Sequence, residues 1–280
     1  MIPKGGRLLL LIPAYNEEER IEAALRRYVE AFERAIPEQY TIIVVLNGCR
    51  DQTLDVVERL QRGYPGIGVL NFSERIGKGG ALIRGVKAAP EVDWIAYVDA
   101  DGATAPEELL RLVALCEAKD CVIGSRWLPG AVLHRQQTLT RQFASRVFHF
   151  IVQLLFQLGV KDTQCPAKVF TKKVAEAVQS NLRIADLAFD VNLLYSMKRA
   201  GFVIHEEPTE WTDQLGSKVT QTLFRSSLVM FLSILRLRLY YSPFYRFMKP
   251  LRGIEEWIYL KLRTPFIPWG DEPDRDSPNE

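Results

Sequence analysis

The sequence has few of the residues that build metal centres and disulfide frameworks. Three histidines and four cysteines occur in 280 residues, and no two cysteines stand in C-x-x-C spacing. Structural zinc sites use four closely spaced Cys or His ligands, so we expect no zinc site. The cysteines are expected to be free, buried thiols in a reducing compartment; they are Cys49, Cys116, Cys121 and Cys165.

Long apolar runs are missing as well. No stretch reaches the ~18 apolar residues of a membrane-spanning helix. The first apolar run, residues 8–12, is too short for the core of a signal peptide, and a polar turn follows it. We therefore expect no export signal. We also found no internal repeat, and we expect no nucleic-acid partner.

The net charge is small but unevenly distributed. The formal value is +2, yet the last ten residues carry five acids and one Arg, a net charge of about −4. A segment of that composition has nothing to bury, so we expect residues 266–280 to form an acidic, disordered tail.

Strand and helix patterns alternate along the first 125 residues. We expect strands at 8–12, 41–46, 67–72, 94–98 and 121–124, with helices at 18–35, 53–60, 78–88 and 106–117. This alternation predicts an α/β fold, a mostly parallel sheet with helices on both faces. Ligands bind such sheets beyond the carboxyl ends of the strands. The turns at 13–16, 47–48 and 99–101 should therefore meet at one edge.

The second half combines apolar helices with basic residues. We expect helices at 141–160, 189–199 and 220–241, a loop and strand at 162–170, and a strand at 202–205. From Arg126 to Lys173 there are eight Lys or Arg and one Asp. Basic residues beside an apolar helix suit an anionic headgroup at a membrane surface. The alternative that 220–241 is a core helix stays open.

Two carboxylates follow the buried strand at 94–98. Asp99 and Asp101 stand two residues apart, and Mg²⁺ prefers such oxygen ligands and shares them with substrate phosphates. A metal there would neutralise a leaving diphosphate. The alternative is a polar turn that caps the next helix through Thr104 or Asp101.

Three further features have a structural and a functional interpretation. The turn 13–18 either caps the first helix through Asn16 or forms a wall of a nucleotide site, with Tyr15 against the base. The glycine-rich stretch 77–81 either permits close packing or binds an anion at a helix start, where Lys78 adds charge. Asp190 either caps a helix, faces an acceptor or orients a basic group.

Together these motifs resemble family 2 glycosyltransferases of the GT-A (Rossmann-like) fold, and most closely the dolichyl-phosphate glucosyltransferases and dolichyl-phosphate mannose synthases. The stretches that carry the resemblance are Pro13-Ala14-Tyr15-Asn16-Glu17, Gly77-Lys78-Gly79-Gly80-Ala81, Asp99-Ala100-Asp101-Gly102-Ala103-Thr104, Gly124-Ser125-Arg126, Asp162-Thr163-Gln164-Cys165, Phe189-Asp190-Val191 with Leu193-Leu194-Tyr195, and Trp211-Thr212 with Gly216-Ser217-Lys218.

The resemblance implies an inverting hexosyltransferase. Its donor would be UDP-glucose or GDP-mannose, its acceptor a polyprenyl or dolichyl phosphate, and its metal Mg²⁺ or Mn²⁺ held by Asp99 and Asp101. Arg126, Arg141 and Lys218 would hold the acceptor phosphate. Asp101 and Asp190 would be the catalytic residues. The donor-binding residues implied are Pro13, Ala14, Tyr15, Glu17, Asn47, Asp51, Lys78, Asp99, Ala100, Asp101 and Gln164.

Departures from the family pattern narrow this interpretation. Mannose-type members have a Gln where this chain has Ala103, which favours glucose. Paired acids are usual after the second strand, whereas here Asn47 stands there and only Asp51 is acidic nearby. Pro166 and Ala167 replace a usual Gly-Phe pair.

The expected organisation is a glycosyltransferase domain at 1–219, amphipathic membrane-associating helices at 220–265 and the tail at 266–280. Without an N-terminal anchor, membrane contact would come from the amphipathic regions, at the cytoplasmic face. Three other functions stay open: transfer to a soluble acceptor, a sugar-phosphate nucleotidyltransferase, and a non-catalytic membrane scaffold. The nucleotidyltransferase usually has a G-x-G-x-R-type loop after the first strand, and residues 13–16 do not match it.

Overall fold

The computed structural model describes residues 5–134, 139–184, 186–212 and 223–242 of the chain. At its centre is a seven-stranded sheet in the order β3-β2-β1-β4-β7-β5-β8. The strands are β1 Leu8–Ala14, β2 Tyr40–Asn47, β3 Ile67–Phe72, β4 Trp94–Tyr97, β5 Cys121–Ser125, β7 Lys168–Thr171 and β8 Ile204–Pro208. Only β7 runs antiparallel to its neighbours β4 and β5, so the prediction of a mostly parallel sheet is confirmed.

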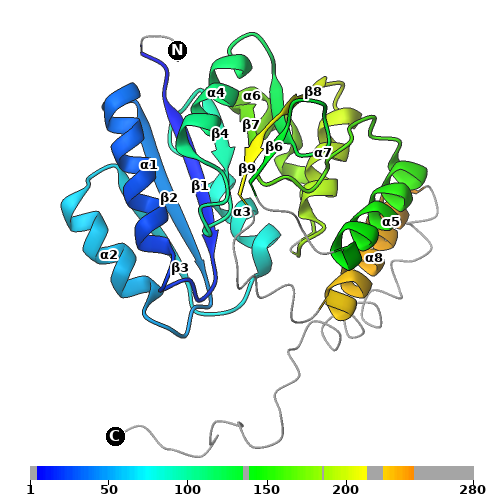
Figure 1. Cartoon of the computed structure of the whole chain (residues 1–280), viewed down its shortest axis with the longest axis horizontal. Helices are drawn as coiled ribbons and strands as arrows, with labels where there is room; N and C mark the ends of the chain where they lie inside the picture. Colours follow the sequence, from blue (N-terminus) through cyan, green and yellow to red (C-terminus); the bar gives the residue numbers. More distant parts are fainter. Residues whose placement is uncertain (1–4, 135–138, 185, 213–222, 243–280) are drawn as a thin grey trace, which may run out of the picture.

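Helices cover both faces of the sheet (Figure 1). One face carries α1 Ile21–Ala35, α2 Thr53–Gly63 and α4 Pro106–Cys116; the other carries α3 Gly77–Lys87, α6 Lys172–Val178 and α7 Phe189–Arg199. Two longer helices, α5 Leu139–Phe156 and α8 Leu223–Tyr240, pack on each other at one side of the molecule.

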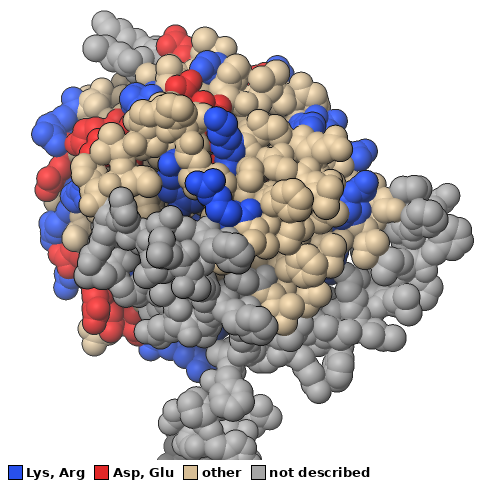
Figure 2. Space-filling view, turned by 45° about the vertical axis from the view of Figure 1, so that its right-hand side comes forward, with Lys and Arg blue, Asp and Glu red and all other residues tan. Residues whose placement is uncertain are grey.

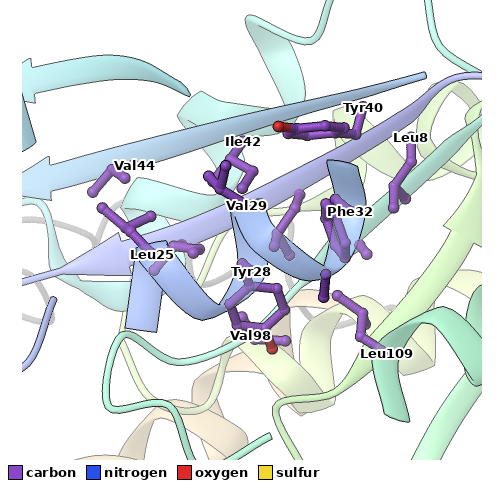
Figure 3. Packing of buried hydrophobic residues seen from close by; sticks show 14 of the residues in the cluster. Leu8, Leu25, Tyr28, Val29, Phe32, Tyr40, Ile42, Val44, Val98 and Leu109 are labelled. Carbon is purple, nitrogen blue, oxygen red and sulfur yellow. The ribbon is translucent and has the colours of Figure 1, made fainter. Parts of the chain in front are cut away.

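Strand β1 separates the two halves of the core. Leu8, Leu10 and Ile12 point to the α1 side, while Leu9 and Leu11 point to the α3 side, because successive side chains of a strand face opposite ways. All five are fully buried. Figure 3 shows the α1 side, where the apolar stripe of α1 packs onto β1 and β2. This central strand is thereby fixed, and with it the turn at its carboxyl end.

The first helix begins later than the sequence predicted. It starts at Ile21 rather than residue 18, and Asn16, with φ 53°, is not its cap. The backbone N–H groups of Glu17 and Glu18 instead donate to the side chains of Thr53 and Asp51. The side chains of Thr53 and Asp51 thus satisfy two backbone N–H groups that precede the helix.

Two other capping predictions were wrong. The residue before α4 is Ala105, followed by Pro106 at the first helical position, so neither Thr104 nor Asp101 caps that helix. Ala188, not Asp190, precedes α7. The side chains of Asp101, Thr104 and Asp190 therefore do not cap these helices.

Helix α6, a 3-10 turn and the strands β6 and β9 were not predicted, whereas strand β7 falls where the sequence analysis expected a loop and strand, at 162–170. Strand β7 runs directly into α6 and a 3-10 turn at Gln179–Asn181, and a short parallel pair joins β6 Val132–Leu133 to β9 Glu210–Trp211. Helix α8 buries Ile234 and Leu237 but exposes Leu228 and Leu239. It is therefore both a packing helix and a partly apolar surface. The remainder of 220–265 and the whole of 266–280 lie outside the described residues.

Among the helices that the structure describes, none is long and apolar enough to span a bilayer. The four cysteines are free, as predicted; three are buried and Cys49 is half-buried.

Candidate functional site

The polar turns after β1, β2 and β4 meet at the carboxyl edge of the sheet. Strands β2 and β4 both pair in parallel with β1, so their carboxyl ends lie on either side of the end of β1. Contacts join the turns: Asn16 donates its N–H to the Cys49 sulfur, and the Lys78 ammonium reaches Asp99. The sequence prediction that these segments converge is confirmed by this arrangement.

Asp99 and Asp101 form the acidic centre of this edge. The side chain of Asp99 is 37% exposed, and Asp101, also half-buried, accepts a hydrogen bond from the N–H of Ala103 at 3.0 Å. Gly102, which lies between Asp101 and Ala103, has φ 71°, a conformation that glycine adopts without strain. Burial, and then the neighbouring charge of Asp99, raise the pKa of Asp101 to about 6. The pair therefore favours a bound cation.

Lys78 supplies one cation to this pair. Its Nζ lies 2.6 Å from Oδ1 of Asp99. Burial opposes the charged form, but the charges of Asp99 and Asp190 outweigh it and raise the pKa of Lys78. The turn before Lys78 is held by Asn47, whose Oδ1 accepts from the N–H groups of Ile76 and Gly77. The Oδ1 atom of Asn47 therefore has a structural role, because it fixes the turn that positions Lys78.

A second group of predicted donor residues forms the wall beside β1. Pro13 and Ala14 end that strand, and the ring of Tyr15 lies 4.0 Å below the guanidinium carbon of Arg75. The Glu17 carboxylate pairs with Arg20.

Asp51 is held in this wall by its neighbours. It accepts from the N–H of Glu18 and from both the N–H and the hydroxyl of Thr53. Burial raises the pKa of this carboxyl, but the hydrogen bonds from Thr53 outweigh that effect and lower it. These contacts fix the shape of the turn.

Asp190 lies in a buried polar network behind the acidic pair. Its Oδ1 accepts from the hydroxyl of Tyr97 at 2.5 Å and from Nζ of Lys168 at 2.6 Å. Burial opposes ionisation, but Lys168 and then Lys78 lower the pKa of the carboxyl. A buried carboxylate with a lowered pKa is a weak base, which argues against general-base catalysis. Of the three sequence interpretations, orienting a basic group fits this geometry.

Arg126 is already paired within the protein. Its guanidinium and Asp162 share two parallel hydrogen bonds of 2.7 and 3.0 Å, and the Arg126 N–H also donates to that carboxylate. The guanidinium carbon lies 5.1 Å from the ring centre of Trp211. Of the other predicted phosphate ligands, Lys218 and the side chain of Arg141 lie outside the described residues.

Sequence reasoning missed several residues of this edge. Lys168 is fully buried at the start of β7, and an isolated Lys in the apolar run Ala167–Phe170 was the available signal. Trp211 belonged to a quoted motif but was given no role, and Thr104 was considered only as a helix cap. Each has a buried polar atom without a hydrogen-bond partner among the described residues.

The donor set at this edge suits a hard divalent cation. Within the described ranges no three His, Cys, Asp or Glu side chains cluster as metal ligands, so a cation at this edge would have to be held by the two carboxylates of Asp99 and Asp101. Two neighbouring carboxylates, one of which has its pKa raised by burial and then by the other's charge, suit Mg²⁺ or Mn²⁺, which complete their shells with water and substrate phosphates.

Comparison with known proteins places this geometry in context. A family model described as "Glycosyl transferase family 2" matches residues 10–179. The dolichyl-phosphate beta-glucosyltransferase of Dictyostelium discoideum is 33% identical over 246 residues, which cover 84% of this chain and 74% of that protein. The glycosyltransferase AglD of Haloferax volcanii is 33% identical over 235 residues, 83% of this chain but 37% of AglD.

A solved structure shares the fold. Glucosyl-3-phosphoglycerate synthase from Mycobacterium tuberculosis, in complex with Mn²⁺, UDP and glucosyl-3-phosphoglycerate, superposes with a TM-score of 0.62 at 17% identity. The match covers 83% of this chain and 80% of that one. At this identity it speaks for the fold alone, and it confirms the architecture that the sequence predicted.

Proposed function

The chain belongs to glycosyl transferase family 2 and is a glycosyltransferase, and we propose that it moves glucose from UDP-glucose to a dolichyl or other polyprenyl phosphate. The observation that carries the proposal is the pair of carboxylates, Asp99 and Asp101, at the carboxyl edge of the sheet, where burial and then the charge of Asp99 raise the pKa of Asp101. The similarity to a dolichyl-phosphate beta-glucosyltransferase over 84% of this chain supports the sugar and the acceptor.

In the proposed reaction, an oxygen of the lipid phosphate attacks the anomeric carbon of the donor from the side opposite the diphosphate. The bond between that carbon and the diphosphate oxygen breaks, and the nucleoside diphosphate leaves with the electron pair. A phosphate monoester has a second pKa of about 6. It is therefore largely ionised at neutral pH and needs no strong base, which agrees with the buried, ion-paired state of Asp190.

The residues of the site would act by positioning and by charge. Asp99 and Asp101 would hold Mg²⁺ or Mn²⁺, which when bound would neutralise charge on the departing diphosphate. Lys78 is placed to move from Asp99 to a donor phosphate, since its ammonium already reaches that carboxylate. Tyr15, Glu17 and Asp51 would shape the nucleotide side of the site.

An exposed apolar surface on α5 supports contact with a membrane. Helix α5 exposes Val147, Phe150 and Leu154 by 42%, 66% and 68%, at spacings that put them on one face. Arg146, also exposed, stands next to them. Figure 2 turns the α5–α8 side forward and shows Lys and Arg side chains gathered near uncharged ones. We propose peripheral binding at the cytoplasmic face, through apolar insertion and attraction to anionic lipid.

Transfer assays test this function. The full chain is incubated with UDP-glucose, GDP-mannose or dTDP-glucose, with dolichyl phosphate in vesicles or 3-phosphoglycerate in solution, and with or without Mn²⁺. We expect metal-dependent glucosyl-lipid from UDP-glucose alone. Product with the soluble acceptor, independent of vesicles, would overturn the lipid assignment.

Variants locate the activity within the structure. Asp101→Ala should abolish transfer while the melting temperature stays close to wild type. Asp55→Ala, at an exposed position of α2, is the matched control and should transfer normally. Normal turnover by Asp101→Ala would remove the proposed metal site.

A further inference from the structure

Three buried polar atoms at the edge of the sheet have no hydrogen-bond partner among the described residues. They are the hydroxyl of Thr104, Nε2 of Gln164 and the indole Nε1 of Trp211. Thr104 is 3% exposed and Trp211 6%. A fourth such atom, Nδ1 of His149, belongs to α5, where that ring packs against Trp127. Buried polar groups in native proteins are nearly always paired, so three orphans at one edge call for a physical reason.

The three residues are joined to one another by backbone and side-chain contacts. Thr104 and Trp211 face each other in an isolated antiparallel bridge, next to a hydrogen bond from the N–H of Thr212 to the carbonyl of Ala103. Gln164 is linked to them through Asp162. The Gln164 N–H donates to that carboxylate, which also holds the guanidinium stacked on Trp211.

Their position relative to the acidic pair limits what they can bind. Thr104 follows Asp101 by three residues, and the carbonyl of Thr104 is fixed by the hydroxyl of Tyr28 at 2.9 Å. A diphosphate held at Asp99 and Asp101 therefore has its attached sugar within reach of this cluster.

The chemistry of the three atoms favours neutral hydroxyl groups over a phosphate. The indole N–H only donates, the amide NH₂ donates, and the threonine hydroxyl donates or accepts. None carries charge, and the guanidinium of Arg126, which lies over the Trp211 ring, is already neutralised by a bidentate bond to Asp162. A sugar ring offers oxygens that accept and hydroxyl hydrogens that donate, which is the pattern these atoms lack.

We propose that Thr104, Gln164 and Trp211 form the hexose site and read the sugar's hydroxyl groups. This rests on the proposed function. The family resemblance placed Gln164 near the sugar; the hydroxyl of Thr104 and the indole of Trp211 are new assignments. Such a site selects strongly against a donor that lacks a contacted hydroxyl, because a buried protein group then stays unpaired.

Conservative variants and deoxy donors test the assignment. Thr104→Val removes the hydroxyl at nearly constant shape. Trp211→Phe removes the N–H while keeping an aromatic face for Arg126. Each should lower kcat/KM for UDP-glucose by about tenfold, the loss of one hydrogen bond between uncharged groups. Among the 2-, 3-, 4- and 6-deoxy donors, one should be used equally well by variant and wild type.

A matched control separates this effect from general loss of packing. Trp94→Phe changes a buried tryptophan at the amino end of β4, away from the acidic pair. It should reduce stability without altering the ranking of donors. If Trp211→Phe also lowers kcat/KM by the same factor for every donor, the hexose assignment is wrong.

Melting temperatures without substrate give an independent readout. If the three atoms wait for a ligand, Thr104→Val leaves the melting temperature unchanged or raises it, and Trp211→Phe lowers it no more than Trp94→Phe does, since both tryptophans are buried and lose the same volume. If an ordered water or another segment of the chain satisfies these atoms, Thr104→Val melts several degrees lower and Trp211→Phe loses more than Trp94→Phe, and the proposal is overturned.

Thermal shifts separate failure of this inference from failure of the proposed function. If the wild type makes no glucosyl-lipid, the proposed function has failed, but UDP-glucose should still stabilise it more than UDP does. That excess should be smaller in Trp211→Phe, which loses one of the three proposed contacts to the sugar. An equal excess in both proteins, or none with UDP-, GDP- or dTDP-hexoses in the wild type, refutes the hexose site.

Discussion

The buried pair of Lys168 and Asp190 allows a quantitative test of how this edge is built. The Lys168 ammonium is fully buried and lies 2.6 Å from Oδ1 of Asp190. It also donates to the carbonyl of Cys165 and lies 5.4 Å from the ring centre of Tyr97. Replacing it with methionine keeps most of the volume but leaves the Asp190 carboxylate without its direct cation.

We expect Lys168→Met to lower the free energy of unfolding at pH 7 by about 3–4 kcal/mol. Removing one partner of a buried pair costs roughly 3–5 kcal/mol. The loss is capped by protonation of Asp190, which from an ordinary pKa of about 3.9 requires about 4 kcal/mol at pH 7. For a chain of this size the melting temperature should fall by roughly 6–16 °C.

The loss in free energy of unfolding should also depend on pH, and the charges around Asp190 determine whether it grows or shrinks as pH rises. In the wild type, Lys168 and Lys78 outweigh burial and lower the pKa of Asp190. Its stabilisation is therefore present above the unfolded carboxyl pKa and is lost only as pH falls through the lowered folded pKa. In the variant, burial would raise the folded pKa. The unfolded state then releases its proton first, and the deficit grows by about 1.4 kcal/mol per pH unit above about pH 4.

Urea unfolding at pH 5, 6, 7 and 8 measures this deficit. Lys172→Met is the matched control, since Lys172 pairs with Glu91, whose side chain is 88% exposed. Such surface pairs contribute at most about 1 kcal/mol, with no comparable pH dependence. Adding Asp190→Asn to Lys168→Met should restore most of the loss at pH 8. A deficit that is constant from pH 5 to pH 8 would show that packing, not buried charge, explains it.

Three further outcomes are expected. Lys78→Met should raise the affinity for Mn²⁺ without donor about two- to fivefold by electron paramagnetic resonance, because it removes the cation at Asp99; unchanged affinity would contradict competition. Gly48→Ala should cost about 1–3 kcal/mol in urea unfolding, since φ is 66° and the new Cβ would lie 2.8 Å from backbone atoms, whereas Gly201→Ala, with positive φ but open space, should cost about 1 kcal/mol. Arg126→Lys should cost roughly 1–3 kcal/mol by losing the bidentate bond to its carboxylate, and a stability equal to wild type would contradict that reading.

The regular half of the fold was predictable because its pattern is local. The alternation of apolar strands and amphipathic helices up to Ser125 needs no knowledge of distant contacts, and those elements appear within a few residues of their predicted ends. The start of α1 is the exception. It is displaced by hydrogen bonds from Glu17 and Glu18 to the turn after β2, and a pairing between segments 36 residues apart has no local signature.

The second half was less predictable because its pairings are non-local. Strand β7 is four residues long and reverses direction between two parallel strands, and β9 finds β6 only after the chain has folded. Short strands of this kind have too few residues for period-two alternation to show. Helix α6 is likewise only seven residues long, below the length at which helical periodicity is readable.

The candidate site divides in the same way. The motif at Asp99 and Asp101 could be located from a strand end, because parallel strands deliver their carboxyl ends to one edge. The state of each carboxyl could not, since the raised pKa of Asp101 depends on burial and on its neighbour's charge. Nor could the sequence tell that Arg126 is neutralised by Asp162, 36 residues away.

The polar residues of this edge therefore fall into two sets that sequence alone cannot separate. Asp162 and Asp190 have found strong partners inside the protein, so they hold other groups in place and have little capacity left for a ligand. By contrast, Asp101 has a raised pKa, and Thr104 and Trp211 each have a buried polar atom without a hydrogen-bond partner among the described residues. Buried groups without partners destabilise the free protein. They are therefore expected where a bound ligand supplies the missing partner. The first set would keep the second in position, so mutations in the first should change stability and those in the second should change substrate use.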